Sequence, residues 1–390
     1  MKKYIIIAAV VLFVCSCAPK EVKFGETGKT FGWDKYDSAR DIVKTDDGTF
    51  VLAGMTTSIG AGHVDAWIFN VDRRGKKRWS VAYGTAGDDR ALCLAKGADS
   101  GYIAGGFTAE PGASAKKLML LKTDNKGRLE WRKVYGGPGN DEALAVEAIP
   151  GRGYAVAGHS NSFGEDGKVD AWIIKTDIKG DILWDRTYGG VGQDVFESVL
   201  PADGGKILAA GRTSSFGVES FDAYAVMADA KGNCVWSRTY GGSGFDGVYA
   251  ALPADEGFVF ACVKGEPEKT RGGHIWLIGI DPEGNVVWEK VYEDANMERP
   301  VDIIHGNDGG FVIAGTSESM DGEITDIFIM KTDSAGNKIY KNYYGGRKEE
   351  YAGGVISVEG GYAAAGWSAS YGEGEYSAWM FTIDENGKMR

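Results

Sequence analysis

An all-β fold of seven four-stranded blades is predicted by three observations on this sequence. First, the phrase WRKVYGGPGND, which begins at Trp131, returns as WDRTYGGVGQD and as WSRTYGGSGFD. Second, the aromatic residue before its glycines, which we call the marker, recurs at spacings of 52, 52, 53, 52, 52 and 52 residues, at Phe31, Tyr83, Tyr135, Tyr188, Tyr240, Tyr292 and Tyr344. Third, each unit consists of short apolar runs separated by glycine-rich turns, which is typical of strands. One sheet per repeat of this length predicts a seven-bladed β-propeller.

Each unit divides into four strands, which we name A to D from the hub outward. In the third unit, strand B reads GYAVAG, strand C reads DAWIIKTD, and strand D reads DILWDRTY and ends on the next marker. Strand A carries an aliphatic or small residue eleven positions after the marker: Ile42, Leu94, Val146, Val199, Ala251, Ile303 and Val355. Six D strands carry a large aromatic residue four positions before the marker: Trp79, Trp131, Trp184, Trp236, Trp288 and Tyr340. We expect this ring to wedge between neighbouring blades, where truncating it costs about 3–5 kcal/mol.

The turn between strands C and D has the same two residues in every unit. An aspartate ends strand C and a glycine follows three positions later, as in Asp177 and Gly180. An aspartate side chain accepts hydrogen bonds from turn amides, and glycine adopts the left-handed conformation that closes such a hairpin. The repetition of this pair therefore has a structural explanation.

The two ends of the chain are expected to complete one blade together. The last unit stops at ENGKMR, before it could supply a strand D. The segment KFGETGKTF, residues 23–31, precedes the first marker and has no blade of its own. We expect it to form the outer strand of blade seven, which would remove the open sheet edge. Residues 23–390 are then a single propeller domain.

The first residues have the features of an export signal. A short basic start, MKK, precedes the apolar run YIIIAAVVLFV, which is too short to span a bilayer comfortably, and VCSC follows. This resembles the lipobox of bacterial lipoproteins, which implies a signal peptide over residues 1–16, lipidation of Cys17 and a tether over 17–22. The protein would then be exported and lipid-anchored to a bacterial membrane, on its periplasmic side or at the cell surface. The alternative is a plain secretory signal with an incidental cysteine.

Composition limits the possible partners and chemistry. The net charge of −12 argues against nucleic acid as a partner. Three cysteines remain after Cys17, at Cys93, Cys234 and Cys262; they are far apart, so we expect small buried side chains and no structural disulfide. The four histidines have no metal-ligand spacing, and no catalytic motif is present. We therefore expect no cofactor, metal or catalytic residue, although a glycosidase carboxylate pair stays open.

The segment TDIKGDILWDRTY resembles the tryptophan-docking repeat of the pyrroloquinoline quinone propellers. The same motif type occurs in the propeller lipoprotein of the outer-membrane β-barrel assembly machinery, and the whole unit is similar to a tandem repeat of uncharacterised exported bacterial and archaeal proteins. The resemblance implies a propeller over residues 22–390. The quinone enzymes usually have eight blades and an adjacent cysteine pair, whereas this chain has seven repeats and no such pair after its first residues. A quinone cofactor is therefore disfavoured.

Alternate connections of a four-stranded meander fall on opposite faces, so the D–A crossings and the long B–C loops should share one face. A ligand should bind there, over the central channel. The sixth residue after each marker is acidic on that face: Asp37, Asp89, Asp141, Asp194, Asp246, Glu298 and Glu350. These acids could form a ring that binds a cation, or each could cap the amides of its own crossing. Repulsion within a bare ring and the repetition in all seven units favour capping.

Units five and six depart most from the repeat. Unit five has the charged loop KGEPEKTRGGH, and unit six replaces YGG by YEDANMER. The candidate binding residues in these segments are Lys264, Glu266, Lys269, Arg271, His274, Glu293, Asp294, Asn296 and Arg299. Drift in a solvated loop is the alternative explanation.

These observations favour a cell-envelope lipoprotein that acts as a binding or scaffold module. Its partner would be a protein or glycan of the envelope, and its contact with the membrane would be through the lipid anchor only. A propeller-type carbohydrate-active enzyme, a glycan hydrolase or lyase, is the alternative function, and a purely structural envelope component is the third.

Overall fold

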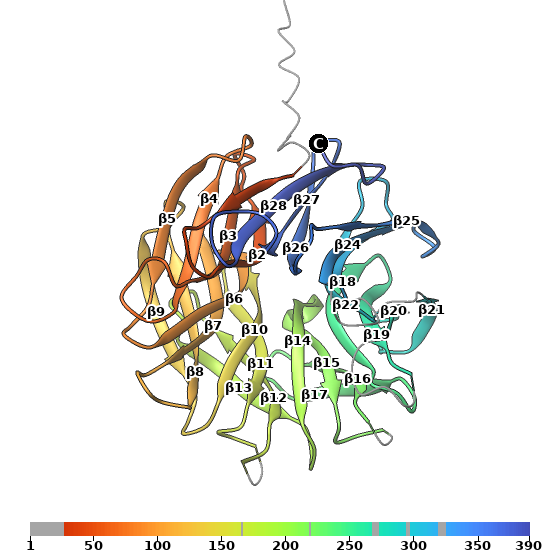
Figure 1. Cartoon of the computed structure of the whole chain (residues 1–390). Coiled ribbons are helices and arrows are strands. Elements are labelled where there is room, and N and C mark those ends of the chain that lie inside the picture. Colours follow the sequence, from red (N-terminus) through yellow and green to blue (C-terminus); the bar gives the residue numbers. More distant parts are fainter. Residues whose placement is uncertain (1–26, 165–166, 218–219, 267–272, 294–296, 319–324) are drawn as a thin grey trace, which may run out of the picture.

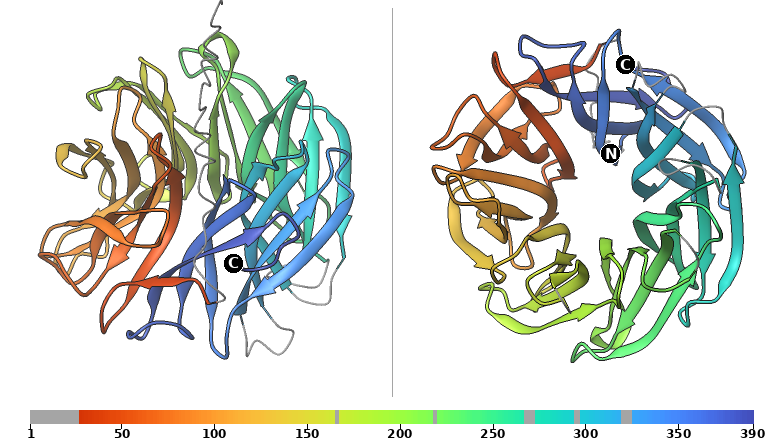
Figure 2. Two further views of the ribbon diagram at one scale, coloured as in Figure 1. Left: turned by 90° about the horizontal axis from the view of Figure 1, so that it is seen from above. Right: turned by 60° about the horizontal axis from the view of Figure 1, so that its bottom comes forward.

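Seven four-stranded antiparallel sheets stand in a ring around a central opening (Figures 1 and 2). The computed structural model describes residues 27–390 apart from 165–166, 218–219, 267–272, 294–296 and 319–324. The predicted seven-bladed β-propeller is confirmed. In this described part of the chain, no helix is long and apolar enough to cross a membrane.

Blades 1 to 6 are meanders in which consecutive strands pair. Blades 1 to 3 consist of β2 (Asp37–Lys44), β3 (Phe50–Thr56), β4 (Asp65–Val71), β5 (Lys77–Tyr83), β6 (Asp88–Lys96), β7 (Tyr102–Ala109), β8 (Lys116–Thr123), β9 (Leu129–Tyr135), β10 (Asp141–Ile149), β11 (Gly153–Ser160), β12 (Asp170–Thr176) and β13 (Ile182–Tyr188). Blades 4 to 6 consist of β14 (Asp194–Pro201), β15 (Ile207–Thr213), β16 (Asp222–Ala228), β17 (Cys234–Tyr240), β18 (Gly247–Ala254), β19 (Gly257–Lys264), β20 (His274–Ile280), β21 (Val286–Tyr292), β22 (Met297–His305), β23 (Phe311–Glu318), β24 (Thr325–Thr332) and β25 (Lys338–Tyr344). A 3-10 turn, η2 (Asp203–Gly205), joins β14 to β15.

Blade 7 is built from both ends of the chain. Its sheet has the order β1-β28-β27-β26, with β1 (Lys29–Phe31), β26 (Glu350–Val358), β27 (Gly361–Ser368) and β28 (Ser377–Asp384). Lys29 pairs with Met380 and Phe31 with Ala378. The predicted closure is therefore confirmed for residues 29–31, whereas residues 23–26 of the predicted strand lie outside the described residues.

The core is divided among the junctions between blades. Seven buried apolar clusters are found in the described residues, and each draws its side chains from two neighbouring blades. Between blades 3 and 4, for example, Ile173 and Trp184 meet Phe196 and Tyr224. Each sheet thus buries both faces, which explains the continuous apolar runs of strands B and C.

The strand-D aromatic side chain packs between neighbouring blades, as predicted, and there it contacts the C–D turn of the next blade. Gly180 has a φ of 78°, and a Cβ placed there would lie 3.0 Å from the Trp131 ring, so only glycine fits. The Trp131 indole donates a hydrogen bond to the Ile178 carbonyl at 3.2 Å, and the hydroxyl of the marker Tyr135 donates to the Gly180 carbonyl at 2.6 Å. The Asp177 carboxylate accepts two amide hydrogens of the same turn. The repeated Trp, Tyr, Asp and Gly therefore form one contact between blades.

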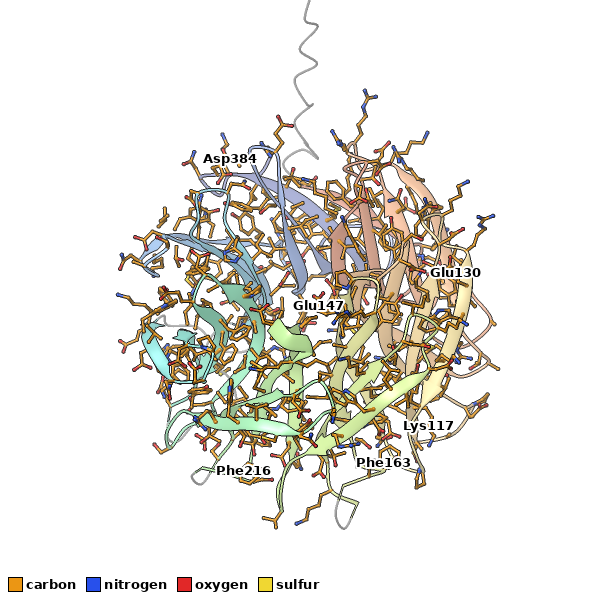
Figure 3. All side chains as sticks on the ribbon, turned by 180° about the vertical axis from the view of Figure 1, so that it is seen from behind. Lys117, Glu130, Glu147, Phe163, Phe216 and Asp384 are labelled. Atoms are coloured by element: carbon orange, nitrogen blue, oxygen red, sulfur yellow. The ribbon has the colours of Figure 1, made fainter. Side chains whose placement is uncertain are left out.

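The D–A crossings and B–C loops share one face of the ring, which we call the loop face. The amide of Asp89 in a crossing donates to the carbonyl of Val64 in a B–C loop at 2.8 Å, and Asp194 makes the same bond to Val169. Figure 3 shows Phe163 and Phe216, from two B–C loops, at one end of the molecule and Asp384, the last residue of β28, at the other.

Cys93 and Cys262 are buried and Cys234 is exposed, and none of the three is in a disulfide. The expectation of burial is wrong for Cys234, because it lies at the start of an outermost strand, β17, whose first two side chains face solvent.

Candidate functional site in the central channel

The acids six positions after the markers lie at the D–A crossings and are buried. Asp37, Asp89, Asp141, Asp194, Asp246 and Glu350 are 0% exposed and Glu298 is 1% exposed. In six crossings, the second amide after the marker donates to the acid. Asp141, for example, accepts the Gly137 amide at 3.0 Å and the Ser162 hydroxyl at 2.7 Å. This is the geometry that a local cap requires; whether these acids also bind a cation stays a question for experiment.

The glycine after the marker is fixed by the same contact. Gly136 has a φ of 124°, and a Cβ there would lie 2.0 Å from Asp141 Oδ2. Glu293 takes the place of this glycine in the sixth crossing, where the acid is a glutamate, Glu298. The Glu298 carboxylate accepts hydrogen bonds from the Lys341 ammonium and from the Tyr343 hydroxyl on β25. Unit six therefore supports its acid from strand D of its own blade.

A second carboxyl group faces several crossings, and the sequence analysis did not identify it. Asp65, at the start of β4, is 1% exposed; its Oδ2 accepts the Gly62 amide at 3.0 Å, and its buried Oδ1 has no hydrogen-bond partner in the described part of the chain. At the equivalent Asp326, burial and then the charge of Glu350 raise the pKa. The neighbouring negative charge thus favours the protonated form of Asp326. Among the described residues, no group of three or more His, Cys, Asp or Glu side chains is placed to hold a metal ion.

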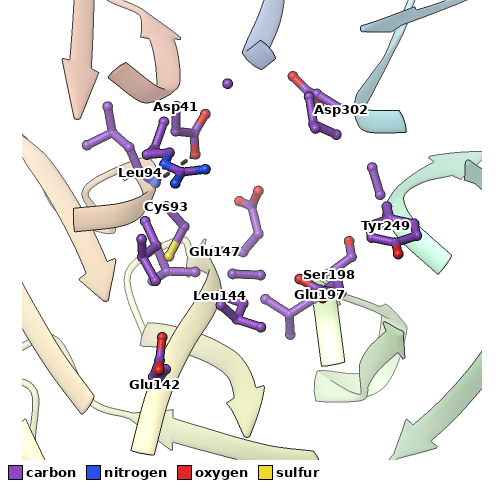
Figure 4. Close-up of a pocket in the computed structure, with 18 of the residues that line it drawn as sticks. Asp41, Cys93, Leu94, Glu142, Leu144, Glu147, Glu197, Ser198, Tyr249 and Asp302 are labelled. Atoms are coloured by element: carbon purple, nitrogen blue, oxygen red, sulfur yellow. Dashed lines mark hydrogen bonds between the residues drawn. The ribbon is translucent and has the colours of Figure 1, made fainter. Parts of the chain in front are cut away.

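A cavity of about 490 Å³ occupies the central channel, and residues of all seven blades line it. Figure 4 shows Asp41, Glu147, Tyr249 and Asp302 directed into the opening from different strands. Every strand A has a register shift between its eighth and tenth positions after the marker. The ninth residue is the one displaced by this bulge, and all seven line the cavity: Arg40, Leu92, Leu144, Glu197, Tyr249, Val301 and Gly353. The bulge thus presents to the channel a set of side chains that differs from blade to blade.

Three carboxyl groups line the cavity: those of Asp41 and Asp302 are half-buried, and that of Glu147 is accessible from the channel. Asp41 accepts the amide of Leu94 in the next blade at 2.7 Å, and Asp302 accepts the amide of Val355 in the next blade at 2.8 Å. Burial, followed by the charge of Asp302, raises the pKa of Glu147 to about 7. Burial also raises the pKa of Asp302 to about 6 and that of Asp41 well above its usual range, with a further contribution from Asp302. This wall can therefore hold protons near neutral pH, which is a property of acid–base sites.

A second hollow of about 400 Å³ adjoins the channel on the loop face. Arg90, Phe107 and Lys116 line both spaces. The hollow continues between the B–C loop of blade 2, residues 110–114, and the preceding crossing, residues 86–88. Together the two spaces can accommodate a ligand longer than the channel alone.

The structure brings one of the predicted loop residues into the channel. Arg299 lines the cavity. Lys264 lies 3.8 Å from Asp246 and 4.2 Å above the Trp276 ring, which are structural contacts. His274 lies 3.3 Å from Glu266, and Glu293 is exposed. The other candidates, Lys269, Arg271, Asp294 and Asn296, and the lipidation site Cys17, lie outside the described residues.

The other residues of the cavity wall were not predicted, although the sequence contains a pattern that indicates them. Positions seven and nine after the marker carry charged, aromatic and apolar residues in different units, next to an invariant acid at position six. A comparison of these positions across the seven units would have located the cavity wall.

The comparisons with known proteins support the architecture and no activity. No protein-family description matches the chain. No curated protein sequence matches it either. A solved structure described as a putative 6-phosphogluconolactonase from Bacteroides fragilis is similar, with a TM-score of 0.53 and 14% identity over 88% of this chain and 92% of that chain. The corresponding protein of Bacteroides uniformis has a TM-score of 0.53 and 14% identity over 87% and 94%. At these identities the likeness shows the propeller fold alone.

Proposed function

We propose that this protein is a lipid-anchored binding module of a bacterial cell envelope that holds its ligand in the central channel, on the loop face. The observation that carries the proposal is the cavity of about 490 Å³ whose wall differs in every blade. Cavities of this size with a few convergent polar groups are the usual place for ligands. The partner is a glycan or protein of the envelope, reached from the loop face.

The contrast between repeated and unrepeated positions supports binding over a purely structural role. A scaffold alone would be served by the same residue at each equivalent position, as at the crossing acids. The channel instead combines Arg40, Glu197 and Tyr249 at equivalent positions of three blades. Such a mixture provides orientation and specificity for an asymmetric ligand.

A channel-filling substitution tests this proposal. Ser198, which lines the cavity, is changed to Trp, and Val287, an exposed residue of the outer strand β21, is changed to Trp as the matched control. Thermal unfolding is measured with soluble envelope glycans and proteins as probes, since a ligand that binds the native state raises the midpoint. We expect a shift for the mature chain and for Val287→Trp that is lost in Ser198→Trp. An equal shift in all three proteins would place binding elsewhere and refute the proposal.

The anchor is tested by Cys17→Ala. Without the thiol no lipid can be attached, so the variant should appear in the soluble fraction of the cell, whereas the unchanged protein should remain with the membrane. Continued membrane association and unchanged processing would refute the lipid anchor.

The alternative function, a glycan hydrolase or lyase, is favoured by one observation: the carboxyl group of Glu147 lines the cavity with a pKa raised to about 7 by burial. A carboxyl group with such a pKa is suited to act as a general acid or base near neutral pH. Oligosaccharides that bind in the channel are incubated with the protein and with Glu147→Gln, and new chain ends are counted. Cleavage that disappears in Glu147→Gln while binding persists would establish enzymatic activity. If the unchanged protein leaves the oligosaccharides intact, binding remains the proposed function.

A further inference from the structure

Three arginine side chains gather on one part of the channel wall: Arg40 from blade 1, Arg90 from blade 2 and Arg299 from blade 6, which line the same cavity. Burial lowers the pKa of Arg40, and the charges of Arg299 and Arg90 lower it further. The Arg40 guanidinium is therefore close enough to both of the others to be repelled by them. We call them the arginine cluster.

The arginine cluster is poorly neutralised by the protein. Within the described part of the chain, the Arg40 guanidinium makes no hydrogen bond or ion pair, and the buried Nε of Arg90 has no hydrogen-bond partner. Arg299 lies over the Tyr249 ring, 5.8 Å from its centroid, and makes no ion pair with any of the described residues. The Arg90 guanidinium lies 4.0 Å from the Asp88 carboxylate and over the Phe107 ring, 5.6 Å from its centroid.

Other cations of the molecule show how this protein neutralises such charges where it does so. Lys116 pairs with Glu142 at 2.8 Å, and Arg212 pairs with Glu197. Arg40 and Arg90 are half-buried and Arg299 is exposed to the channel, so retaining the three charges together is favoured by another source of negative charge. An anionic ligand would supply it, and guanidinium groups bind carboxylate and sulfate with paired hydrogen bonds.

A row of aromatic rings leads from the arginine cluster to the outside of the loop face. Tyr351 is near enough to Arg40 to influence its pKa, and its ring stacks on Trp367 with centroids 4.5 Å apart. Trp367 meets Tyr376 edge-on at 4.5 Å, and Tyr376 lies 5.2 Å from Tyr36, which is 40% exposed. We call these four side chains the aromatic row.

We infer that the arginine cluster binds the carboxylate or sulfate group of an acidic oligosaccharide whose sugar rings stack on the aromatic row. This inference rests on the proposed function, because it assigns a ligand class to the same channel. Sugar rings offer C–H faces to aromatic side chains and hydroxyl groups to polar ones, and the cavity provides both. The adjoining hollow at Arg90, Phe107 and Lys116 gives a chain of sugars a second path out of the channel.

The experiment compares defined probes by isothermal titration calorimetry. An oligogalacturonate supplies carboxylates, its fully methyl-esterified form is the neutral matched control, and a sulfated galactan oligosaccharide distinguishes sulfate from carboxylate as the source of charge. An oligoglutamate peptide of similar charge tests whether the sugar matters. We expect one acidic saccharide to bind, the methyl ester and the peptide to bind at least about tenfold more weakly, and affinity to fall as the salt concentration rises.

The variants are Arg40→Gln and Arg299→Gln, with Arg186→Gln on the exposed outer strand β13 as the matched control. Each cluster variant should bind the acidic saccharide about tenfold more weakly or worse, because a charge-assisted hydrogen bond is lost. The unfolding midpoint of the free variants should stay the same or rise, because repulsion within the cluster is relieved. Arg186→Gln should change neither quantity. The two variants change different blades. If one of them misfolds, the other variant and the comparison of the acid with its methyl ester still test the inference.

Each other outcome overturns the inference in a distinguishable way. If the acid and its methyl ester bind equally, the anionic assignment is wrong while the channel-binding function stands. If the peptide binds as tightly as the saccharide, the saccharide assignment is wrong. If neither acidic saccharide binds, or if Arg40→Gln and Arg299→Gln bind as the unchanged protein does, the arginine cluster is not the site.

Discussion

The D–A crossings and the channel wall are neighbours along strand A, yet their chemistry differs. The crossing has the same acid in every unit, buried and held by nearby amides and hydroxyls, as Asp141 is by Gly137 and Ser162. Three positions later, the wall has Arg40 in one blade and Glu197 in another. Residues that close the ring repeat because each junction has the same geometry, whereas residues that face a single asymmetric ligand need not. We call the repeated residues that hold the blades together the frame of the propeller, and the unrepeated residues of the channel wall its site.

The largest effect is expected from removing part of the frame. A chain that begins at residue 32 lacks β1, so blade 7 loses its outer strand and Phe31, which is buried and lies 5.4 Å from the Phe69 ring. The Trp379 indole also loses its bond to the Thr27 carbonyl at 2.9 Å. Because removal of a buried Phe side chain alone costs about 3–5 kcal/mol, the free energy of unfolding should fall by at least that amount.

Urea unfolding of this chain is compared with that of a chain that begins at residue 27 and keeps β1. Equal free energies of unfolding would mean that β1 and its closure of the ring do not contribute to stability.

An intermediate effect of opposite sign is expected in the channel. Glu147 has a pKa raised from 4.5 to about 7 by burial and by Asp302, so the native state binds more protons than the unfolded state between these values. Stability from this group is therefore present below about pH 4.5 and is lost as the pH rises through about 7. Glu147→Gln should be more stable than the unchanged protein at about pH 8 and should equal it near pH 4.5; because the Glu147 side chain is accessible from the channel, the gain is smaller than the full pKa difference implies.

Denaturant unfolding across this pH range checks the prediction, with the exposed Glu359→Gln as control. The other charged groups of the cavity are common to both proteins: Arg40, Asp41, Arg90, Lys116, Glu142, Glu197, Arg299 and Asp302. A Glu147→Gln variant that is less stable at high pH would show that Glu147 belongs to the frame.

The smallest effect is expected at the crossing acids. Asp141→Asn and Asp194→Asn each remove one acceptor from a buried cap, which should lower the free energy of unfolding by about 0.5–2 kcal/mol. The two caps use different partners, Gly137 and Gly190 among them, so the double change should be close to additive. Calorimetry with and without calcium should show no calcium-dependent shift.

A calcium-dependent rise of the unfolding midpoint that a single Asp→Asn change abolishes would show that the crossings form a cation site. The unpartnered Oδ1 of Asp65 beside its crossing makes this a demanding test, since a cation there would gain a second carboxylate. Higher stability of Asp141→Asn without calcium would point the same way, because removing a charge would then relieve repulsion.

The fold could be predicted because its signals are local and are repeated seven times. The spacing of the markers gave the number of blades, and the pair Asp177 and Gly180 gave the C–D turn with its conformation. The last unit ends before its strand D, and this predicted that an N-terminal strand closes blade 7, as residues 29–31 do. Of the predicted loop residues described, however, only Arg299 reaches the channel, and the exposed Cys234 was expected to be buried.

By itself, the sequence determined the ring: how many blades it has, where each begins, and which residues hold one blade to the next. These features follow from short-range turn chemistry and apolar periodicity, which a single unit contains in full. Only the tertiary structure decided which residues share the channel. The bulge in each strand A turns the ninth residue toward the opening against the simple alternation of a strand, and ring closure brings Arg40 and Arg299, which are far apart in the chain, to one wall. A bulge and a ring closure are properties of paired strands and of the whole assembly, so no single segment of the sequence specifies them.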